Sequence, residues 1–515
     1  MLTRYVAFAV YMVVVAVVGL VAARKVKSLS DFVAASGRLG FWTYVLLMVG
    51  SVFSGMTCIG VAGLSYLTGY ANLWERVLGP PLAIALATML YAPKLVKVSK
   101  RTGILTLQDY LALRYYDERF IRGLSGAVSA LVCAIYLIGQ YVAIGIVSKV
   151  VFGWEYWQGC LLAAMVVILY VVAGGMFSVA WTTLIQSTLM IGGTMLLAPY
   201  IVSRLGGFTA LNLKASMVSQ GPFYQYLTEP WGPPQLPLIG PLFNLTLFGI
   251  AVTLGLTVAP HIVNNIVTVK RTSCIKWGPL ACYVLGIIVI LGTSLMGLAA
   301  RVAESEGLIE LMPHPLGGKW FDMALPTLAE ALLPEALFSL FLIMVLAAVM
   351  STTDRLMLTI GVNIGYDVYK NLLKPQASER SVSLVAKLTV LAVGIATFII
   401  ALSPPPLVAW LIWLALSLMC NTWLVPLICG LYWRRATKAG CIASMLTGLS
   451  VTIIAGYLSG KPPVGLGWTL KLFDMPYYFV LPGFIASWIA MVTVSLATSK
   501  PAKQLLDDTL TGLFL

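Results

Sequence analysis

Three residues of one apolar segment have the types and spacing of a small cation site. Ala348, Ser351 and Thr352 are separated by three and four positions, so a helix would place them on one face. Two hydroxyls and a backbone carbonyl are neutral oxygens, which a hard cation such as sodium accepts where an unwound helix supplies further carbonyls. A Ser-Thr pair in a helix also often bonds to its own backbone. The spacing therefore leaves a cation site and a back-bonded pair as two open interpretations.

The segments that would position these residues are those of a membrane protein. Of the 515 residues, 60% are hydrophobic and 10% are charged, whereas roughly a quarter of a soluble protein is charged. So few charges cannot cover a water-facing surface, and the lipid bilayer must be the main solvent. The apolar run 5–23 is followed directly by Arg24 and Lys25, which indicates a retained first helix and not a cleaved signal peptide.

A transmembrane span needs about 20 mostly apolar residues, and the chain offers thirteen such runs. They are 5–23, 39–67, 73–91, 124–151, 157–173, 179–202, 236–269, 277–300, 328–366, 381–402, 407–433, 441–458 and 477–497. The expected fold class is therefore an all-α polytopic membrane protein, with one transmembrane domain over residues 1–515.

The charged residues predict the orientation of these spans. Basic clusters follow spans 1, 3, 7, 9, 11 and 13, whereas Glu304, Glu306 and Glu310 follow span 8. Because basic residues stay in the cytoplasm, we expect the N-terminus outside and the C-terminus in the cytoplasm, in the plasma or inner membrane. The net charge of +14 does not indicate nucleic acid, since no basic face is interleaved with aromatic residues. The stretch 106–122 is expected to be an interfacial amphipathic helix.

Two of the spans contain residues that interrupt helices. Residues 49–63 read VGSVFSGMTCIGVAG, and the seventh span contains Gly255, Pro260 and His261. Small residues also allow close packing of intact helices. The two spans lie five apart, however, so five-helix units that begin at them cross the membrane in opposite senses. Interrupted helices at matching positions of two inverted halves point to a transporter binding site.

Four motifs in this order make the chain resemble the solute:sodium symporter family. They are AGGMFSVAWTTLIQ at 173–186, APH at 259–261, LAAVMSTTD at 346–354 and GLYWRRATKAG at 430–440. The resemblance covers the first helix to about residue 440. It implies the leucine-transporter-type fold, with inverted five-helix repeats at 39–203 and 236–434 and accessory C-terminal helices at 435–515. It also implies symport of a small organic solute with sodium by alternating access, without an organic cofactor.

The resemblance also implies the position of the sodium site. Its ligands, carried over by position, are the carbonyls of Gly50 and Phe53 in the first interrupted helix and the carbonyl of Ala348 with the hydroxyls of Ser351 and Thr352.

Many relatives have an aspartate after a Trp-Thr pair on the sixth helix, where it can support a second cation. This chain has Thr183 there, so we expect one sodium ion per cycle. Asp354 and Arg355 are adjacent and follow Ser351 and Thr352 in the same apolar span. Charged residues inside a transmembrane span are functional candidates. A pairing with each other or with a neighbour is the alternative, and Asp354 is the candidate if protons drive transport.

The substrate cavity is expected beside the two interruptions. The residues predicted to line it are Ser54, Met56, Thr57, Gln140, Val252, Leu256 and Pro260. Gln140 either lines the cavity or bonds another helix.

The substrate prediction rests on departures from two subfamilies. Val252 and Leu256 stand where proline transporters have aromatic residues, and Met56 and Thr57 where sugar transporters have glutamate and glutamine. The segment SPPPLVAWL at 403–411 is most similar to pantothenate symporters. A carboxylate such as pantothenate would be drawn to the positive end of a half-helix, and an amino acid such as proline or a sugar is the alternative.

Other protein classes have little support. The two histidines, His261 and His314, have no Cys, Glu or second His at ligand spacing, and no nucleophile motif occurs. We therefore expect neither an enzyme nor a metal other than sodium. A channel is disfavoured because inverted interrupted helices indicate alternating access. The eight cysteines are scattered, without a C-x-x-C pair, and are expected to be buried apolar residues.

Overall fold

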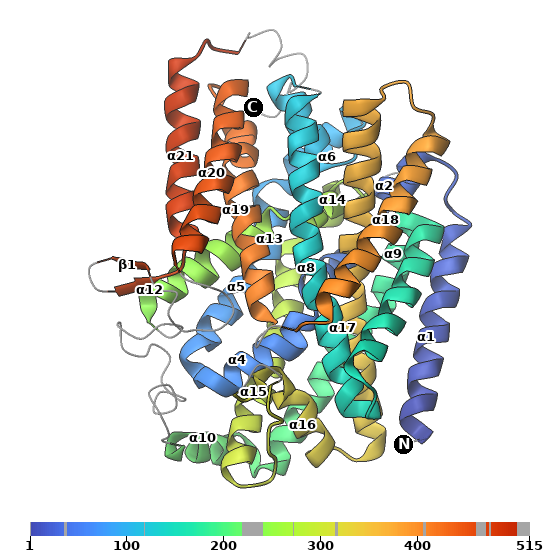
Figure 1. The fold of residues 1–515 in the computed structure, drawn as a ribbon, viewed down its shortest axis with the longest axis vertical. Coiled ribbons are helices and arrows are strands. Elements are labelled where there is room, and N and C mark those ends of the chain that lie inside the picture. The colour runs from blue at the N-terminus through green and yellow to red at the C-terminus, as the bar shows by residue number, and fades with distance from the viewer. Residues whose placement is uncertain are drawn as a thin grey trace.

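The computed structural model describes residues 2–35, 39–117, 119–218, 240–270, 272–314, 318–404, 408–459, 470–472 and 475–501. Within these residues, nine helices are long and apolar enough to cross a membrane. They are α1 (Leu2–Ala23), α8 (Phe120–Phe152), the Val171–Arg204 part of α9, α15 (Gly278–Ser305), α17 with its π-helical extension (Glu335–Leu373), α18 (Glu379–Ala401), α19 (Ala409–Tyr432), α20 (Lys438–Leu458) and α21 (Val480–Ala497). They run side by side in one bundle (Figure 1).

Three further spans are bent. The helix α3 (Phe41–Val52) continues at 57° into Met56–Thr68, which ends as α4 (Val61–Thr68). The end of α5 (Leu73–Leu90) continues at 50° into α6 (Ala92–Thr102). The run Pro241–Thr257, which holds α12 (Pro241–Asn244) and α13 (Gly255–Thr257), continues at 44° into α14 (Pro260–Ile266). Twelve spans result if each bent pair is one span, and the predicted total of thirteen remains a prediction.

The predicted fifth and sixth spans form one element. The helix α9 (Tyr156–Arg204) includes both, and the chain changes direction at Gly175, which has a φ of +49°. A side chain at this position would lie 2.5 Å from the Phe32 ring of α2 (Leu29–Ala34). Only glycine combines this backbone conformation with this close approach.

The short helix α7 (Leu107–Tyr115) corrects one prediction. It begins with a capping box in which the side chains of Thr106 and Asp109 bond each other's backbone N–H. Nearly all of its residues are buried in the protein, so the predicted amphipathic character is wrong for this helix, and its position at the membrane interface remains a prediction. Arg114 explains the burial, because its guanidinium donates to the carbonyls of Gly430 and Trp433 at the end of α19.

The remaining elements lie at the ends and edges of the bundle. They are α10 (Gly207–Met217), α16 (Ala324–Leu332) and a hairpin of β1 (Leu470–Leu472) and β2 (Met475–Tyr477). The hairpin departs from the all-α prediction. The predicted span starts at 236 and 407 lie outside the described residues. The start of α1 and the end of α21 lie at opposite ends of the bundle (Figure 1), and which end is cytoplasmic remains a prediction.

Burial separates a central group of helices from a peripheral one. Most of α8, α17 and α19 is enclosed by protein, whereas most of α1, α18, α20 and α21 is not. The outward side chains of the peripheral helices are apolar, for example Val10, Leu388 and Ile489. Such faces suit lipid. Seven cysteines are free and buried, as predicted; the side chain of Cys274 is not described.

Candidate functional site

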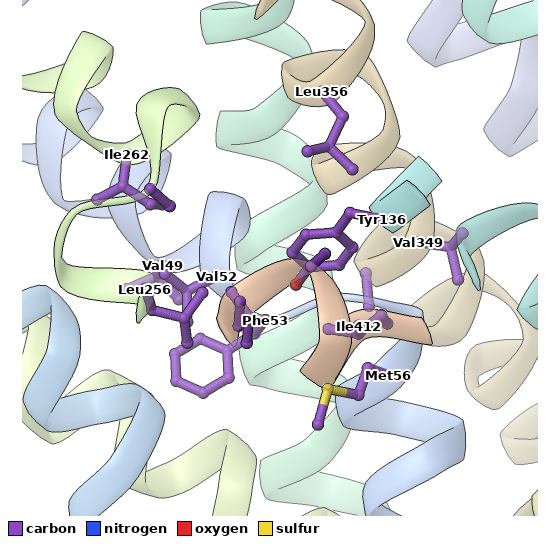
Figure 2. Close-up of a cluster of buried hydrophobic side chains, with 14 of the residues drawn as sticks. Val49, Val52, Phe53, Met56, Tyr136, Leu256, Ile262, Val349, Leu356 and Ile412 are labelled. Atoms are coloured by element: carbon purple, nitrogen blue, oxygen red, sulfur yellow. The ribbon is translucent and has the colours of Figure 1, made fainter. Parts of the chain in front are cut away.

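The first interrupted helix opens at Phe53 and Ser54. Phe53 has extended backbone angles (φ −85°, ψ 109°), which turn its carbonyl away from the helical ladder. The chain resumes as a π-helical turn, Met56–Gly60. Figure 2 shows the apolar side chains that enclose this break, among them Val52, Phe53 and Met56. An unwound segment inside a membrane protein needs other partners for its freed backbone groups.

Three predicted substrate residues supply those partners. The Thr57 hydroxyl accepts from the Ser54 N–H at 3.2 Å, and the Ser54 hydroxyl accepts from the Met56 N–H at 3.2 Å. The Gln140 side chain of α8 accepts from the Gly55 N–H at 3.0 Å. Of the two alternatives for Gln140, the structure therefore supports a bond to another helix. Its amide nitrogen has no hydrogen-bond partner among the described residues.

The predicted sodium ligands of α17 lie against the same helix. The Ser351 hydroxyl donates to the Gly50 carbonyl at 2.9 Å and to the Ala348 carbonyl at 3.0 Å. The Thr352 hydroxyl donates to the Gly50 carbonyl at 3.1 Å. Both side chains are fully buried. Four of the five predicted ligands thus form one cluster of neutral oxygens, and the fifth, Phe53, lies one turn further on at the break.

A close approach of α9 holds the Gly50 carbonyl in this position. A side chain at Gly50 would collide with the Ser187 hydroxyl and would lie 2.6 Å from the Thr183 methyl group. The Ser187 hydroxyl in turn donates to the Leu46 carbonyl of α3 at 2.7 Å. Glycine is therefore required where α3 passes between α9 and α17. Sequence reasoning missed Ser187, although the small residues of 173–187 were a signal for close packing.

The second interrupted helix is anchored by its neighbours. The chain leaves the helix at Val258 and Ala259 and re-enters it at Pro260, which needs no N–H partner at a first helical position. The Tyr91 hydroxyl donates to the Thr257 carbonyl. A side chain at Gly255 would collide with the Leu416 carbonyl of α19. The break therefore stands next to α5 and α19.

The other predicted substrate residues on this helix are buried and apolar. Leu256 belongs to the same cluster of buried apolar side chains as Val49 and Phe53 of the first interrupted helix (Figure 2). Val252 packs against α5, because a methyl group added at Gly79 of α5 would lie 3.9 Å from the Val252 side chain. Pro260 is fully enclosed.

Asp354 faces a different helix from its neighbour Arg355. One Asp354 carboxylate oxygen accepts from the Thr182 hydroxyl of α9 at 3.3 Å. Arg355 donates to the His261 carbonyl of α14 at 3.0 Å. Both charged side chains are buried. No group of three or more His, Cys, Asp or Glu side chains that could hold a metal occurs in the described part of the chain.

The sequence model of the sodium:solute symporter family matches residues 32–448. The chain belongs to this family. The chain is similar to the uncharacterized symporter YwcA of Bacillus subtilis (strain 168), with 26% identity over 94% of both chains. It is also similar to the osmoregulated proline transporter OpuE of the same organism, with 24% identity over 96% of this chain and 94% of that one.

A solved structure supports the fold. It is the substrate-bound outward-open state of a Na+-coupled sialic acid symporter, with a TM-score of 0.76 and 19% sequence identity. The match covers 97% of this chain and 99% of that chain. The expected leucine-transporter-type fold is confirmed, and this member of the family is a multi-pass membrane protein.

A buried carboxylate lies next to the first bent helix, in the segment between α15 and α16. Asp322 accepts from the Val408 N–H at the start of α19 at 2.8 Å and is fully buried. The backbone of Phe321 lies against Gly63 of α4, because a side chain at Gly63 would be 2.8 Å from the Phe321 carbonyl. Burial raises the pKa of the Asp322 carboxyl to about 7, and the bond from Val408 opposes this rise.

The pKa of Asp322 predicts a pH dependence of stability. Between about pH 4 and 7 the folded protein holds a proton on Asp322 that the unfolded chain has released, so stability falls as the pH rises through this window and levels off above it. We expect the melting temperature of the purified protein to rise from pH 7 to 5 by more than that of Asp322→Asn, whose amide oxygen still accepts from Val408. The exposed Glu310→Gln should behave like the wild type. Equal rises in wild type and Asp322→Asn would contradict the prediction.

Proposed function

We propose that this protein is a sodium-coupled symporter of a small organic solute in the plasma or inner membrane, working by alternating access. The observation that carries the proposal is the contact of the Ser351 and Thr352 hydroxyls with the Gly50 carbonyl. These atoms, with the carbonyls of Ala348 and Phe53, are the ligands that we assign to sodium. Membership of the sodium:solute symporter family supports this assignment.

The cluster offers a physical route from ion binding to helix movement. The hydroxyls belong to α17 and the carbonyl to α3, and the two helices meet there through hydrogen bonds. A bound sodium ion takes the Gly50 carbonyl and the hydroxyl lone pairs as ligands, so these direct bonds give way to bonds through the ion. The ion therefore stabilises whichever arrangement of α3 and α17 matches its coordination, and this differential affinity is what shifts a conformational equilibrium.

For the solute we propose a small carboxylate such as pantothenate. The APH motif at the second break and the absence of aromatic residues at Val252 and Leu256 support this choice. Sodium-coupled symport of proline or of a sugar is the alternative, and the similarity to a proline transporter favours the amino acid among these. Coupling to protons through Asp354 and a channel function have less support.

The test of sodium coupling is uptake into proteoliposomes. Radiolabelled pantothenate, proline and glucose are offered with a sodium gradient or with choline in place of sodium, at a fixed pH gradient. We expect accumulation of the true solute only with sodium, because no other ion supplies the driving force. Equal uptake in choline would sink the coupling claim, and uptake that follows an imposed pH gradient would favour Asp354.

We expect one sodium ion per solute. Thr183 offers no negative charge, and the charge of Asp354 is offset by Arg355 beside it, so a second cation has no net counter-charge there. With the membrane potential clamped at zero, a tenfold sodium gradient should balance a solute gradient of about tenfold for one ion and about 100-fold for two. A balance point near the larger value would defeat the expectation.

A further inference from the structure

A guanidinium and an imidazole stand next to the second break with unused hydrogen-bonding capacity. Arg355 lies one helical turn beyond Ser351 and Thr352 and is 1% exposed. One of its terminal nitrogens donates to the His261 carbonyl at 3.0 Å, and the other contacts the Met176 sulfur, which is a weak acceptor. Its Nε has no hydrogen-bond partner within the described residues. A guanidinium has five donors, so most of them are unused.

His261 adds a second unpaired group. Its ring is fully buried, and neither ring nitrogen makes a hydrogen bond of good geometry with the residues described, although the Ser51 backbone lies close to the ring. The ring lies edge-on to that of Tyr136 of α8, with 5.8 Å between their centroids. His261 directly follows Pro260, and Tyr136 lies one turn before Gln140, which bonds the first break. The His261 ring on the second interrupted helix therefore faces α8, which bonds the first one. Figure 2 labels Tyr136 together with Ile262 and Leu356, the residues that follow His261 and Arg355 in the chain.

The neighbouring carboxylate does not use these donors. The Asp354 carboxylate points toward α9, where it accepts from the Thr182 hydroxyl. Its negative charge nevertheless stabilises the buried Arg355 cation. Buried polar groups are normally hydrogen-bonded, and each exception requires an explanation. A ligand that accepts hydrogen bonds from both Arg355 and His261 would explain why these groups are unpaired.

We propose that Arg355 and His261 recognise the carboxylate of the transported solute. The two oxygens of a carboxylate match the guanidinium fork, and one of them can also accept from the imidazole N–H. This inference rests on the proposed symport function and narrows it to solutes with a carboxylate, zwitterionic amino acids included. A sugar such as glucose has no carboxylate to accept from the guanidinium fork and the imidazole together, so the inference excludes sugars as solutes.

The wild-type protein allows a first test without substitution. Purified protein in sodium is melted with pantothenate or its alcohol panthenol, with L-proline or L-prolinamide, with acetate, and with glucose. We expect at least one carboxylate to raise the melting temperature, since a ligand that binds only the folded state stabilises it, and its neutral counterpart to have no effect. Three results would overturn the proposal: glucose stabilises the protein, a neutral counterpart stabilises it as much as its carboxylate does, or no carboxylate stabilises it at millimolar concentration.

Variants of Arg355 provide the second test. Arg355→Gln should weaken binding of the stabilising carboxylate by at least about 30-fold, as for loss of one partner of a buried charge pair, and Arg355→Lys by about tenfold because the fork is lost. The buried Arg114→Gln is the matched control: Arg114 donates to carbonyls at the end of α19, so carboxylate affinity should be unchanged. Retained affinity in Arg355→Gln overturns the inference. If that variant does not fold, Arg355→Lys and the paired ligands still decide.

The effect of sodium separates this inference from the proposed function. Sodium alone should stabilise wild type and Arg355→Lys alike, because its ligands are assigned to other residues. No stabilisation of the wild type by sodium would count against the sodium site. Stabilisation by sodium with no preference for carboxylates would count against Arg355 and His261 only.

Discussion

Replacing Ser351 and Thr352 together with alanine is expected to raise the sodium concentration for half-maximal uptake by at least about tenfold, with expression intact. Each hydroxyl now contacts the Gly50 carbonyl, and each would supply one ligand to the ion. A hydrogen bond or ligand to a charged group contributes about 1.5–3 kcal/mol, so loss of even one accounts for a tenfold change. The sodium concentration for half-maximal uptake is measured in proteoliposomes over a range of sodium concentrations.

Thr353→Ala is the matched control for this double variant. Thr353 is the next residue, is equally buried, and bonds back to the Val349 carbonyl at 2.7 Å. Its removal should leave the sodium dependence unchanged. If the Ser351 and Thr352 double variant keeps the wild-type sodium dependence, these residues are not sodium ligands.

Gly50→Ala should abolish sodium-dependent uptake. The added methyl group collides with the Ser187 hydroxyl and lies 2.6 Å from the Thr183 methyl group, so α3 must move away from α9. The Gly50 carbonyl then shifts away from Ser351 and Thr352. Adding methylene-sized groups to a packed core typically costs about 1–3 kcal/mol, and here the strain falls on a proposed sodium ligand. Uptake at saturating sodium measures the loss.

Removal of the two colliding groups should restore part of the activity. Ser187→Ala and Thr183→Ser delete the hydroxyl and the methyl group that meet the new side chain, so they are combined with Gly50→Ala. The control is Gly192→Ala, since no atom lies within 4 Å of a side chain at Gly192 of α9. Wild-type uptake by Gly50→Ala alone would show that α3 is not held by this contact.

The sequence predicted which oxygens of the proposed sodium site lie together better than it predicted their surroundings. The i, i+3 and i+4 spacing places Ala348, Ser351 and Thr352 on one face wherever the helix lies, and Gly50 was carried over by position from the family resemblance. Gln140 could not be resolved, because a lone amide in an apolar helix is compatible with a cavity or a neighbouring helix. Its bond to Gly55 joins residues 85 positions apart. Such contacts depend on how the helices pack, which the local sequence pattern does not determine.

The same limit explains the other differences. The burial of α7 depends on Arg114 reaching α19, and the bond of Asp322 to Val408 joins residues 86 positions apart. The hairpin of β1 and β2 is too short for a period-two pattern to predict. Arg355 stood out as a buried charge, but its direction toward His261, away from Asp354, required the structure.

The adjacent opposite charges of Asp354 and Arg355 have a consequence for the energetics of the whole cycle. Their sum is zero, so these two side chains add no net charge to the binding site when the empty transporter changes conformation. Loading with one sodium ion and one monocarboxylate also adds zero. On the proposed scheme neither the loaded nor the empty transition moves charge, and the membrane voltage does no work on transport. The sodium concentration difference alone would then set how far the solute accumulates.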